Sequence, residues 1–135
     1  MKANAIIERG TDGTYDVNLE YRENLSFGLF GQGDTVQEAI ADFYNSRDEI
    51  REVYADLGKE FPNDLEFEFK YDVASFLASY AQTLSLAGLE KITGINQRQL
   101  SHYVTGHRRP GRKTVEKIEQ SLHRFGEEIS KVEFV

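Results

Sequence analysis

The sequence contains no cysteine, no tryptophan and only two prolines among its 135 residues. Without cysteine the chain can form no disulfide, no thiolate metal site and no cysteine nucleophile, so we expect packing and oligomerisation to stabilise its fold. No apolar run approaches the roughly 20 residues that cross a bilayer. The first residues also lack the long apolar region of a signal peptide. We therefore expect a cytoplasmic protein without a membrane partner.

Basic residues are scarce overall and unevenly distributed. The chain has 16 Lys and Arg against 23 Asp and Glu, a net charge of −7. Residues 1–72 hold 17 acidic and 7 basic residues, a net of −10, whereas residues 73–135 hold 6 and 9, a net of +3. This asymmetry predicts two regions with different partners, nucleic acid for the basic region and something basic for the acidic one.

Residues 1–72 predict a small sheet crossed by one helix. Alternating or β-branched segments indicate strands, and an apolar face repeating at helical spacing indicates the helix. Asp34 or Thr35 is the expected N-cap of that helix, Glu38 completes a capping box from Thr35, and Gly58 ends the helix. The predicted order is β-β-β-α-β, with strands at 3–9, 15–21, 25–33 and 65–71 and the helix at 36–57.

Residues 73–135 predict helices, with a possible short strand at the C-terminal SKVEFV. Asp72, Ser85 and Asn96 are the expected N-caps, and Gly94 forms the turn between two short helices. Such a pair is typical of a helix-turn-helix. The predicted fold class is α+β: a small β-β-β-α-β N-terminal domain, residues 1–72, followed by an all-α helix-turn-helix domain, residues 73–135.

In a helix-turn-helix the second helix enters the major groove, where its first turn and outward side chains meet base edges. Gln pairs bidentately with adenine and Arg with guanine, so Gln97 and Arg98 are the expected readers of sequence. Basic side chains that follow this helix are expected to meet phosphates. The predicted DNA-binding residues are Asn96, Gln97, Arg98, Ser101, His102, Arg108, Arg109, Arg112 and Lys113.

One such module reads about half of a two-fold operator. We therefore expect a homodimer or a higher oligomer on double-stranded operator DNA.

Residues 85–122, SLAGLEKITGINQRQLSHYVTGHRRPGRKTVEKIEQSL, resemble the helix-turn-helix of phage repressors and Xre-like regulators. Two positions depart from that class. Glu90 stands where the class usually has a small Ala, and Thr93 stands where it usually has an aliphatic residue, which predicts a slightly different crossing of the two helices. The residues that fall on the packing and turn positions of the class are Leu89, Gly94, Ile95, Leu100 and Tyr103.

Over nearly the whole chain, the element order and length resemble those of the HicB family of antitoxins. The resemblance implies a degraded RNase-H-like sheet that covers a small basic ribonuclease toxin of the HicA type, while the C-terminal domain represses its own promoter. On this basis the expected toxin-binding residues are Asp16, Glu20, Tyr21, Phe27 and Phe30.

No catalytic or metal site is indicated. An RNase-H-like sheet can hold carboxylates around Mg²⁺, yet Asp16 and Glu20 share the outward parity of their strand, and the acidic residues of the 36–57 helix fall on its surface. The histidines at positions 102, 107 and 123 are too scattered for a zinc site. We therefore expect no enzyme, no cofactor and no metal.

Two functions stay open. The first is an antitoxin, which needs an exposed acidic and aromatic surface for its toxin. The second is a stand-alone repressor whose N-terminal domain senses a ligand or only dimerises; a sensor needs an enclosed apolar pocket, for which 72 residues leave little room. A third interpretation is that the basic segment merely offsets the acidic half, or that the helix-turn-helix binds protein and not DNA.

Overall fold

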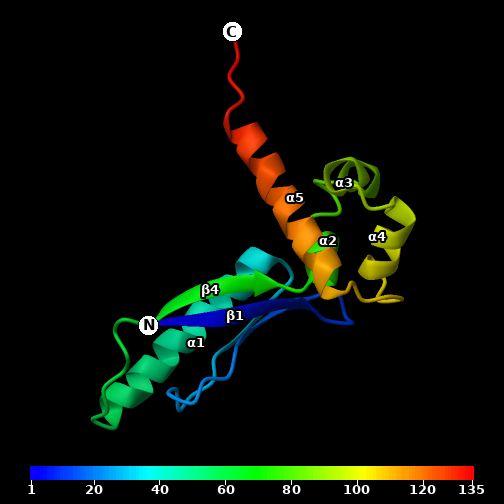
Figure 1. Ribbon diagram of the computed structural model, residues 1–135. Coiled ribbons are helices and arrows are strands. Elements are labelled where there is room, and N and C mark those ends of the chain that lie inside the picture. Colours follow the sequence, from blue (N-terminus) through cyan, green and yellow to red (C-terminus); the bar gives the residue numbers. More distant parts are fainter. The chain divides into compact units, whose positions relative to one another are not determined.

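The computed structural model describes all 135 residues and contains one four-stranded sheet and five α-helices (Figure 1). None of the helices combines the length and the apolar character needed to cross a membrane. The elements in chain order are β1 (Lys2–Arg9), β2 (Tyr15–Leu19), β3 (Phe30–Gly33), α1 (Val36–Asp56), β4 (Glu66–Tyr71), α2 (Val73–Ser79), α3 (Leu86–Thr93), α4 (Gln97–Val104) and α5 (Arg112–Ser130).

The predicted fold class, a sheet domain followed by a separate all-α domain, is wrong because strands and helices are interleaved. The longest helix, α1, lies between β3 and β4, and α2 follows β4 directly. The physical reason is the pairing of β4, which runs parallel to β1 and therefore needs a crossover connection that α1 supplies. The chain divides into two compact units, Met1–Ser75 and Phe76–Val135, and this division falls inside α2.

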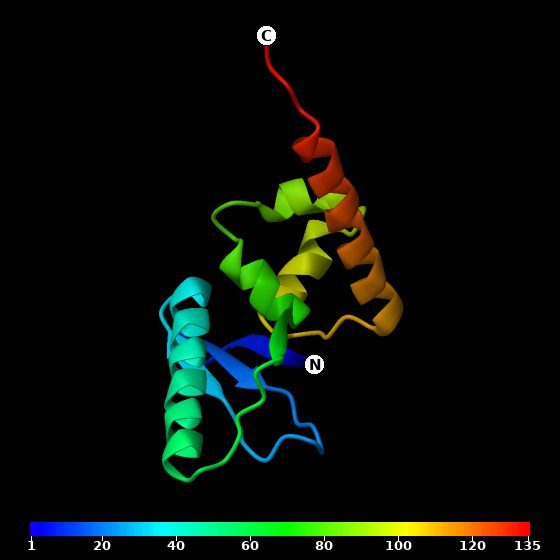
Figure 2. The same ribbon diagram turned by 90° about the vertical axis from the view of Figure 1, so that its left-hand side faces the viewer.

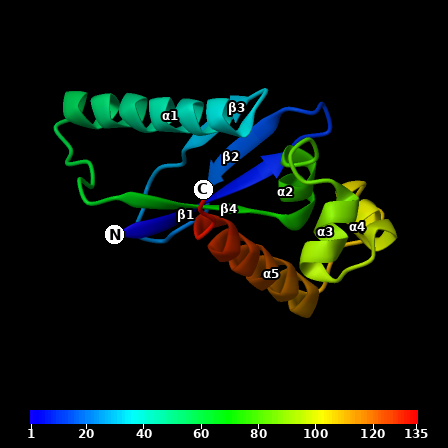
Figure 3. The same ribbon diagram turned by 90° about the horizontal axis from the view of Figure 1, so that it is seen from above.

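In the first unit the strands are ordered β3-β2-β1-β4. Strand β2 pairs antiparallel with both of its neighbours, with Ile7 of β1 and Gly31 of β3 opposite Val17. Odd-numbered residues of all four strands face α1, which covers one side of the sheet (Figure 3). Even-numbered residues lie on the opposite side, which we call the open face.

The core of the first unit lies between α1 and the sheet. Phe43 of α1 is fully buried, and its ring meets Phe67 and Phe69 of β4 edge-on at centroid distances of 4.9 and 5.8 Å. Edge-on aromatic pairs are stabilising beyond the area that they bury. The buried members of this core are Ala5, Ile7, Tyr15, Val17, Leu29, Val36, Ala39 and Phe43.

Two glycines in β3 allow α1 to lie directly on the sheet. A Cβ atom at Gly31 would overlap the Ala39 carbonyl oxygen and the Phe43 nitrogen, and one at Gly33 would stand 2.7 Å from the Ala39 nitrogen. All of these neighbours are helix backbone, which cannot yield as a flexible side chain can.

The side chains of α1 also bond the outer edge of β3. Asp42 accepts from the N–H of Gln32 at 2.9 Å, and Ser46 accepts from the N–H of Phe30 at 3.3 Å. Of the two expected N-caps, Asp34 and Thr35, it is Thr35 that caps the helix, and its hydroxyl accepts from the N–H of Glu38 at 3.1 Å. The Glu38 carboxylate accepts from the N–H of Asp34, one residue before the cap. The sheet edge at β3 is thereby covered.

In the second unit, α3, α4 and the first half of α5 surround Leu89, Leu100 and Ile118, which are buried. The C-terminal half of α5 extends beyond the other helices of this unit (Figure 2). Ile129 near its end is 56% exposed, and the side chains of the tail that follows are exposed as well.

Two expected strands differ in the structure. The expected 25–33 strand shortens to β3, because residues 20–29 leave the sheet while burying Leu25 and Leu29. The expected strand at 130–135 is absent, since α5 continues to Ser130 and the tail pairs with no strand.

Gly31→Ala should destabilise the protein by about 3 kcal/mol, because the added methyl would force α1 away from β3. Gly28→Ala is the matched control, since a Cβ there meets nothing within 4 Å, and it should change stability by less than about 1 kcal/mol. Urea unfolding followed by circular dichroism measures both. Equal midpoints for the two variants would contradict the close approach.

Candidate functional site

The turn between α3 and α4 is built by local hydrogen bonds. The Ser85 hydroxyl accepts from the N–H of Gly88 at 3.0 Å and so starts α3. Gly94 ends α3 in the left-handed region, with φ of 73°, which glycine adopts without strain. Asn96 starts α4 by accepting from the N–H of Arg98 at 2.8 Å. All three predicted residues of this turn are confirmed in their roles.

The two residues that depart from the repressor pattern are both used by the turn. The Glu90 carboxylate accepts from the N–H of Gln97 at 2.8 Å, which ties α3 to the first turn of α4. The buried Thr93 hydroxyl donates to the Leu89 carbonyl at 2.7 Å and accepts from the N–H of Ile95 at 3.1 Å. The pairs are two to seven residues apart, so helix periodicity alone did not reveal them.

Helix α4 buries one side and exposes the predicted reading side. Leu100 and Tyr103 are 0% and 3% exposed, which fixes the orientation of the helix. Gln97 and Arg98 in its first turn are exposed, and Ser101 and His102 are partly exposed. The chain uses neither Gln97 nor Arg98 in a side-chain hydrogen bond, so both remain available to a ligand.

A basic loop follows α4. Arg108 and Arg109 are exposed, as is Lys113 in the first turn of α5. Arg112 is 93% exposed and pairs with Glu116 of the same helix at 3.2 Å, which leaves most of its guanidinium in water. Exposed pairs of this kind contribute little to stability.

The start of α5 adds backbone donors to this basic group. Gly111 caps the helix without a side-chain hydrogen bond, and the first intrahelical bond runs from the N–H of Val115 to the Gly111 carbonyl. The N–H groups of residues 112–114 therefore have no partner in the chain. Free N–H groups beside Arg112 and Lys113 can bind a phosphate. In the sequence, these free N–H groups are indicated by the absence of a Ser, Thr, Asp or Asn cap before the helix.

His102 lies in a crowded basic neighbourhood. Its ring meets that of His107 edge-on at 4.8 Å, and its carbonyl accepts from the N–H of Arg108 at 3.2 Å. Partial desolvation is the main cause that lowers the pKa of His102 below the ordinary 6.5, and the charges of His107, Arg108 and Arg98 lower it further.

The second candidate surface is the open face of the sheet in the first unit. Asp16 lies opposite Glu8 of β1 and Gln32 of β3, so two carboxylates share one row. One carboxylate oxygen of Asp16 is buried and has no hydrogen-bond partner in the chain. Strand parity predicts every acidic residue of this face, although only Asp16 and Glu20 were predicted to bind. Its charged residues are Glu8, Asp16, Glu20, Glu66 and Glu68 against Lys2 and Lys70.

The predicted toxin-binding residues do not form one cluster. Glu20 lies on the open face, where it accepts from the Asn4 amide at 2.6 Å, and Phe30 lies there too, 48% exposed. Tyr21 is 84% exposed and lies outside the sheet, because β2 already ends at Leu19. Phe27 is on the helix side of the sheet, where it packs against the core.

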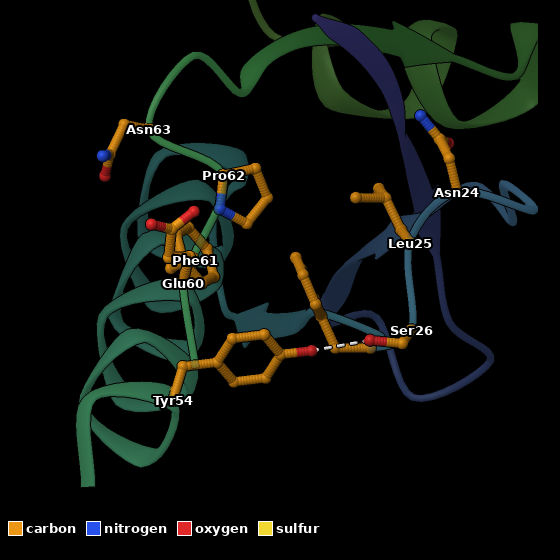
Figure 4. Close-up of a pocket in the computed structure, with 9 residues that line it drawn as sticks. Asn24, Leu25, Ser26, Tyr54, Glu60, Phe61, Pro62 and Asn63 are labelled. Carbon is orange, nitrogen blue, oxygen red and sulfur yellow. Dashed lines mark hydrogen bonds between the residues drawn. The ribbon is translucent and has the colours of Figure 1, made fainter. Parts of the chain in front are cut away.

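Phe27 belongs to an aromatic cluster with Tyr54 and Phe61, stacked on Phe61 at 5.2 Å and edge-on to Tyr54 at 5.7 Å. A cleft of about 400 Å³ lies here, and in it the Tyr54 hydroxyl meets that of Ser26 at 2.7 Å (Figure 4). A second cleft, of about 450 Å³, shares Leu25, Ser26 and Phe27 with the first. Both clefts are open to solvent, so neither is the enclosed apolar pocket that a sensor needs.

Comparisons of the chain with protein-family models, with curated proteins and with solved structures find no match.

Lowering the pH through about 6.5 should reduce folding stability, because the unfolded chain binds a proton at His102 more readily than the folded one. In His102→Gln this contribution disappears, so its stability should vary less over the same interval. Urea midpoints at about pH 7.5, 6.5 and 5.5 test this. An unchanged pH dependence in the variant would contradict the crowding of His102 by its basic neighbours.

Proposed function

We propose that this chain is a cytoplasmic antitoxin of the HicB kind, which represses its own operon through α4 and neutralises a small basic HicA-like toxin through the acidic open face. The DNA-binding part rests on one observation above all. The first turn of α4 exposes Gln97 and Arg98 free of intramolecular side-chain bonds, while Leu100 and Tyr103 anchor the opposite side.

The basic loop gives this reading helix its support on the DNA backbone. Arg108, Arg109 and Lys113 are exposed next to a helix start with unpaired N–H groups. Phosphate contacts of this type set position and orientation, whereas base contacts set sequence preference. The acidic residues of the first unit would repel phosphates, so DNA binding is assigned to the second unit alone.

The toxin-binding part rests on charge. The open face carries Glu8, Asp16 and Glu20, and the exposed ring of Phe30 lies on the same face, opposite Asn18 of β2. A face of this sign accelerates the approach of a basic protein, and an aromatic side chain at its margin supplies apolar contact.

A second candidate function is a stand-alone repressor that senses a ligand. The observation in its favour is the pair of clefts around Leu25 and Phe27, whose volumes fall within the range of small-molecule sites. Polar groups such as Asn24, Glu60 and Asn63 line the larger part of the first cleft's rim. A ligand there would be polar and partly exposed.

Arg98→Ala should weaken binding to the operator by about 1–3 kcal/mol and leave binding to unrelated DNA nearly unchanged. Arg109→Ala should instead weaken binding to both and reduce the salt slope by about one. Fluorescence anisotropy at several salt concentrations, with the chain's own promoter and a scrambled duplex, separates the two. The reverse pattern would mean that base and backbone contacts are wrongly assigned.

The double variant Glu20→Lys with Phe30→Ala should lose a basic partner of under about 100 residues that the native chain captures from its own cytoplasm. Glu49→Lys, which reverses one exposed charge on α1, is the matched control and should keep the partner. Mass spectrometry of the captured material identifies it. Equal capture by the double variant would move the binding surface elsewhere, and no partner at all would favour the ligand-sensing repressor.

A further inference from the structure

The two edges of the sheet differ. The β3 edge is bonded by Asp42 and Ser46 of α1. The other edge, β4, has a hydrogen-bonded neighbour only in β1. The N–H of Glu66 donates toward β1, to the Met1 carbonyl, at 2.8 Å. Backbone groups alternate in direction along a strand, so those of Phe67 and Phe69 point away from β1, toward the free edge of the sheet. An open edge of this kind is a template for another strand.

The sequence of β4, EFEFKY, is charge-complementary to itself in an antiparallel register centred on Phe69. When two copies pair with Phe69 opposite Phe69, Glu68 of each copy lies opposite Lys70 of the other. Moving the centre of the pairing from Phe69 to Glu68 sets Glu66 opposite Lys70 but also Glu68 opposite Glu68, a like-charge contact at the centre that the first register avoids. Opposite charges directly across a strand pair stabilise it, whereas like charges destabilise it. The favoured pairing is centred on Phe69 and ends before Glu66 would face Asp72.

The same register satisfies the backbone. The N–H and C=O of Phe69 point toward the free edge of the sheet, so the two Phe69 residues form a hydrogen-bonded pair. Glu68 and Lys70, whose backbone groups point toward β1, form a non-hydrogen-bonded pair. Phe67 and Phe69 already pack against Phe43 of α1 on the covered side of the sheet. Backbone direction therefore allows this arrangement, and the lack of a like-charge contact at its centre favours it over the one centred on Glu68.

We propose that the partner of the β4 edge is a second copy of this chain, joined antiparallel about Phe69 to form one continuous eight-stranded sheet. The proposal does not depend on DNA or toxin binding. It predicts a two-fold dimer formed by the first unit, whatever the second unit binds.

The absence of cysteine from the chain makes a direct test possible. Glu68→Cys and Lys70→Cys are prepared as separate full-length variants carrying different tags, mixed, and oxidised. Directly opposite residues in a non-hydrogen-bonded pair have Cα atoms about 4.5 Å apart, within reach of a disulfide, whereas like positions lie on the diagonal at about 7–8 Å. We expect the disulfide-linked heterodimer to form and neither variant alone to crosslink. Equal crosslinking of each variant with itself, or no crosslinking in the mixture, would overturn the proposal.

Charge reversal gives a second test that does not rely on crosslinking. Glu68→Lys should weaken the dimer by about tenfold, because two attractive pairs become repulsive. The double variant Glu68→Lys with Lys70→Glu restores opposite charges and should recover the dimer. Glu23→Lys, exposed in the 20–29 segment, is the control and should leave the dimer unchanged. Sedimentation velocity over a concentration series measures all four proteins; a monomer in every case, or a dimer indifferent to these changes, would refute pairing at β4.

Discussion

The fold of the first unit depends on how closely α1 approaches β3. Gly31 and Gly33 bring helix backbone against strand backbone, at a separation that leaves no room for a methyl group. That contact puts Phe43 deep enough to meet the aromatic residues of β4 at the far edge of the sheet. It also brings Asp42 and Ser46 within reach of the β3 backbone. The aromatic packing of Phe43 and the hydrogen bonds to the β3 edge thus both depend on the close approach of α1 to β3.

The charges of the chain follow the same division into two units. Carboxylates gather on the face of the sheet that α1 leaves uncovered, while arginines gather around the short helices of the second unit. A polyanion and a basic protein would each be repelled by the wrong unit. One small chain therefore carries two surfaces of opposite charge.

Local features were the most predictable from sequence. Ser85 and Asn96 cap their helices as predicted, and Thr35 is one of the two caps expected for α1, because a cap involves residues two or three positions apart. Sequence did not predict on which side of the sheet Phe27 lies, nor that β2 ends before Tyr21. Both depend on how residues 20–29 pack after they leave the sheet. The outward side chains of α4 followed from helical spacing, whereas the bond from Glu90 to Gln97 required knowledge of how two helices meet.

The hydrogen bonds from α1 to β3 limit how many copies of this chain can join through the edges of their sheets. A sheet with two free edges can add copies at both and grow into a filament. Here Asp42 and Ser46 already occupy the backbone donors of one edge, so strand addition on that side is blocked. Growth by edge pairing must stop after one step, because a two-fold contact between identical edges closes on itself. Asp42 and Ser46 of α1 thereby prevent the sheet from growing into a polymer by strand pairing.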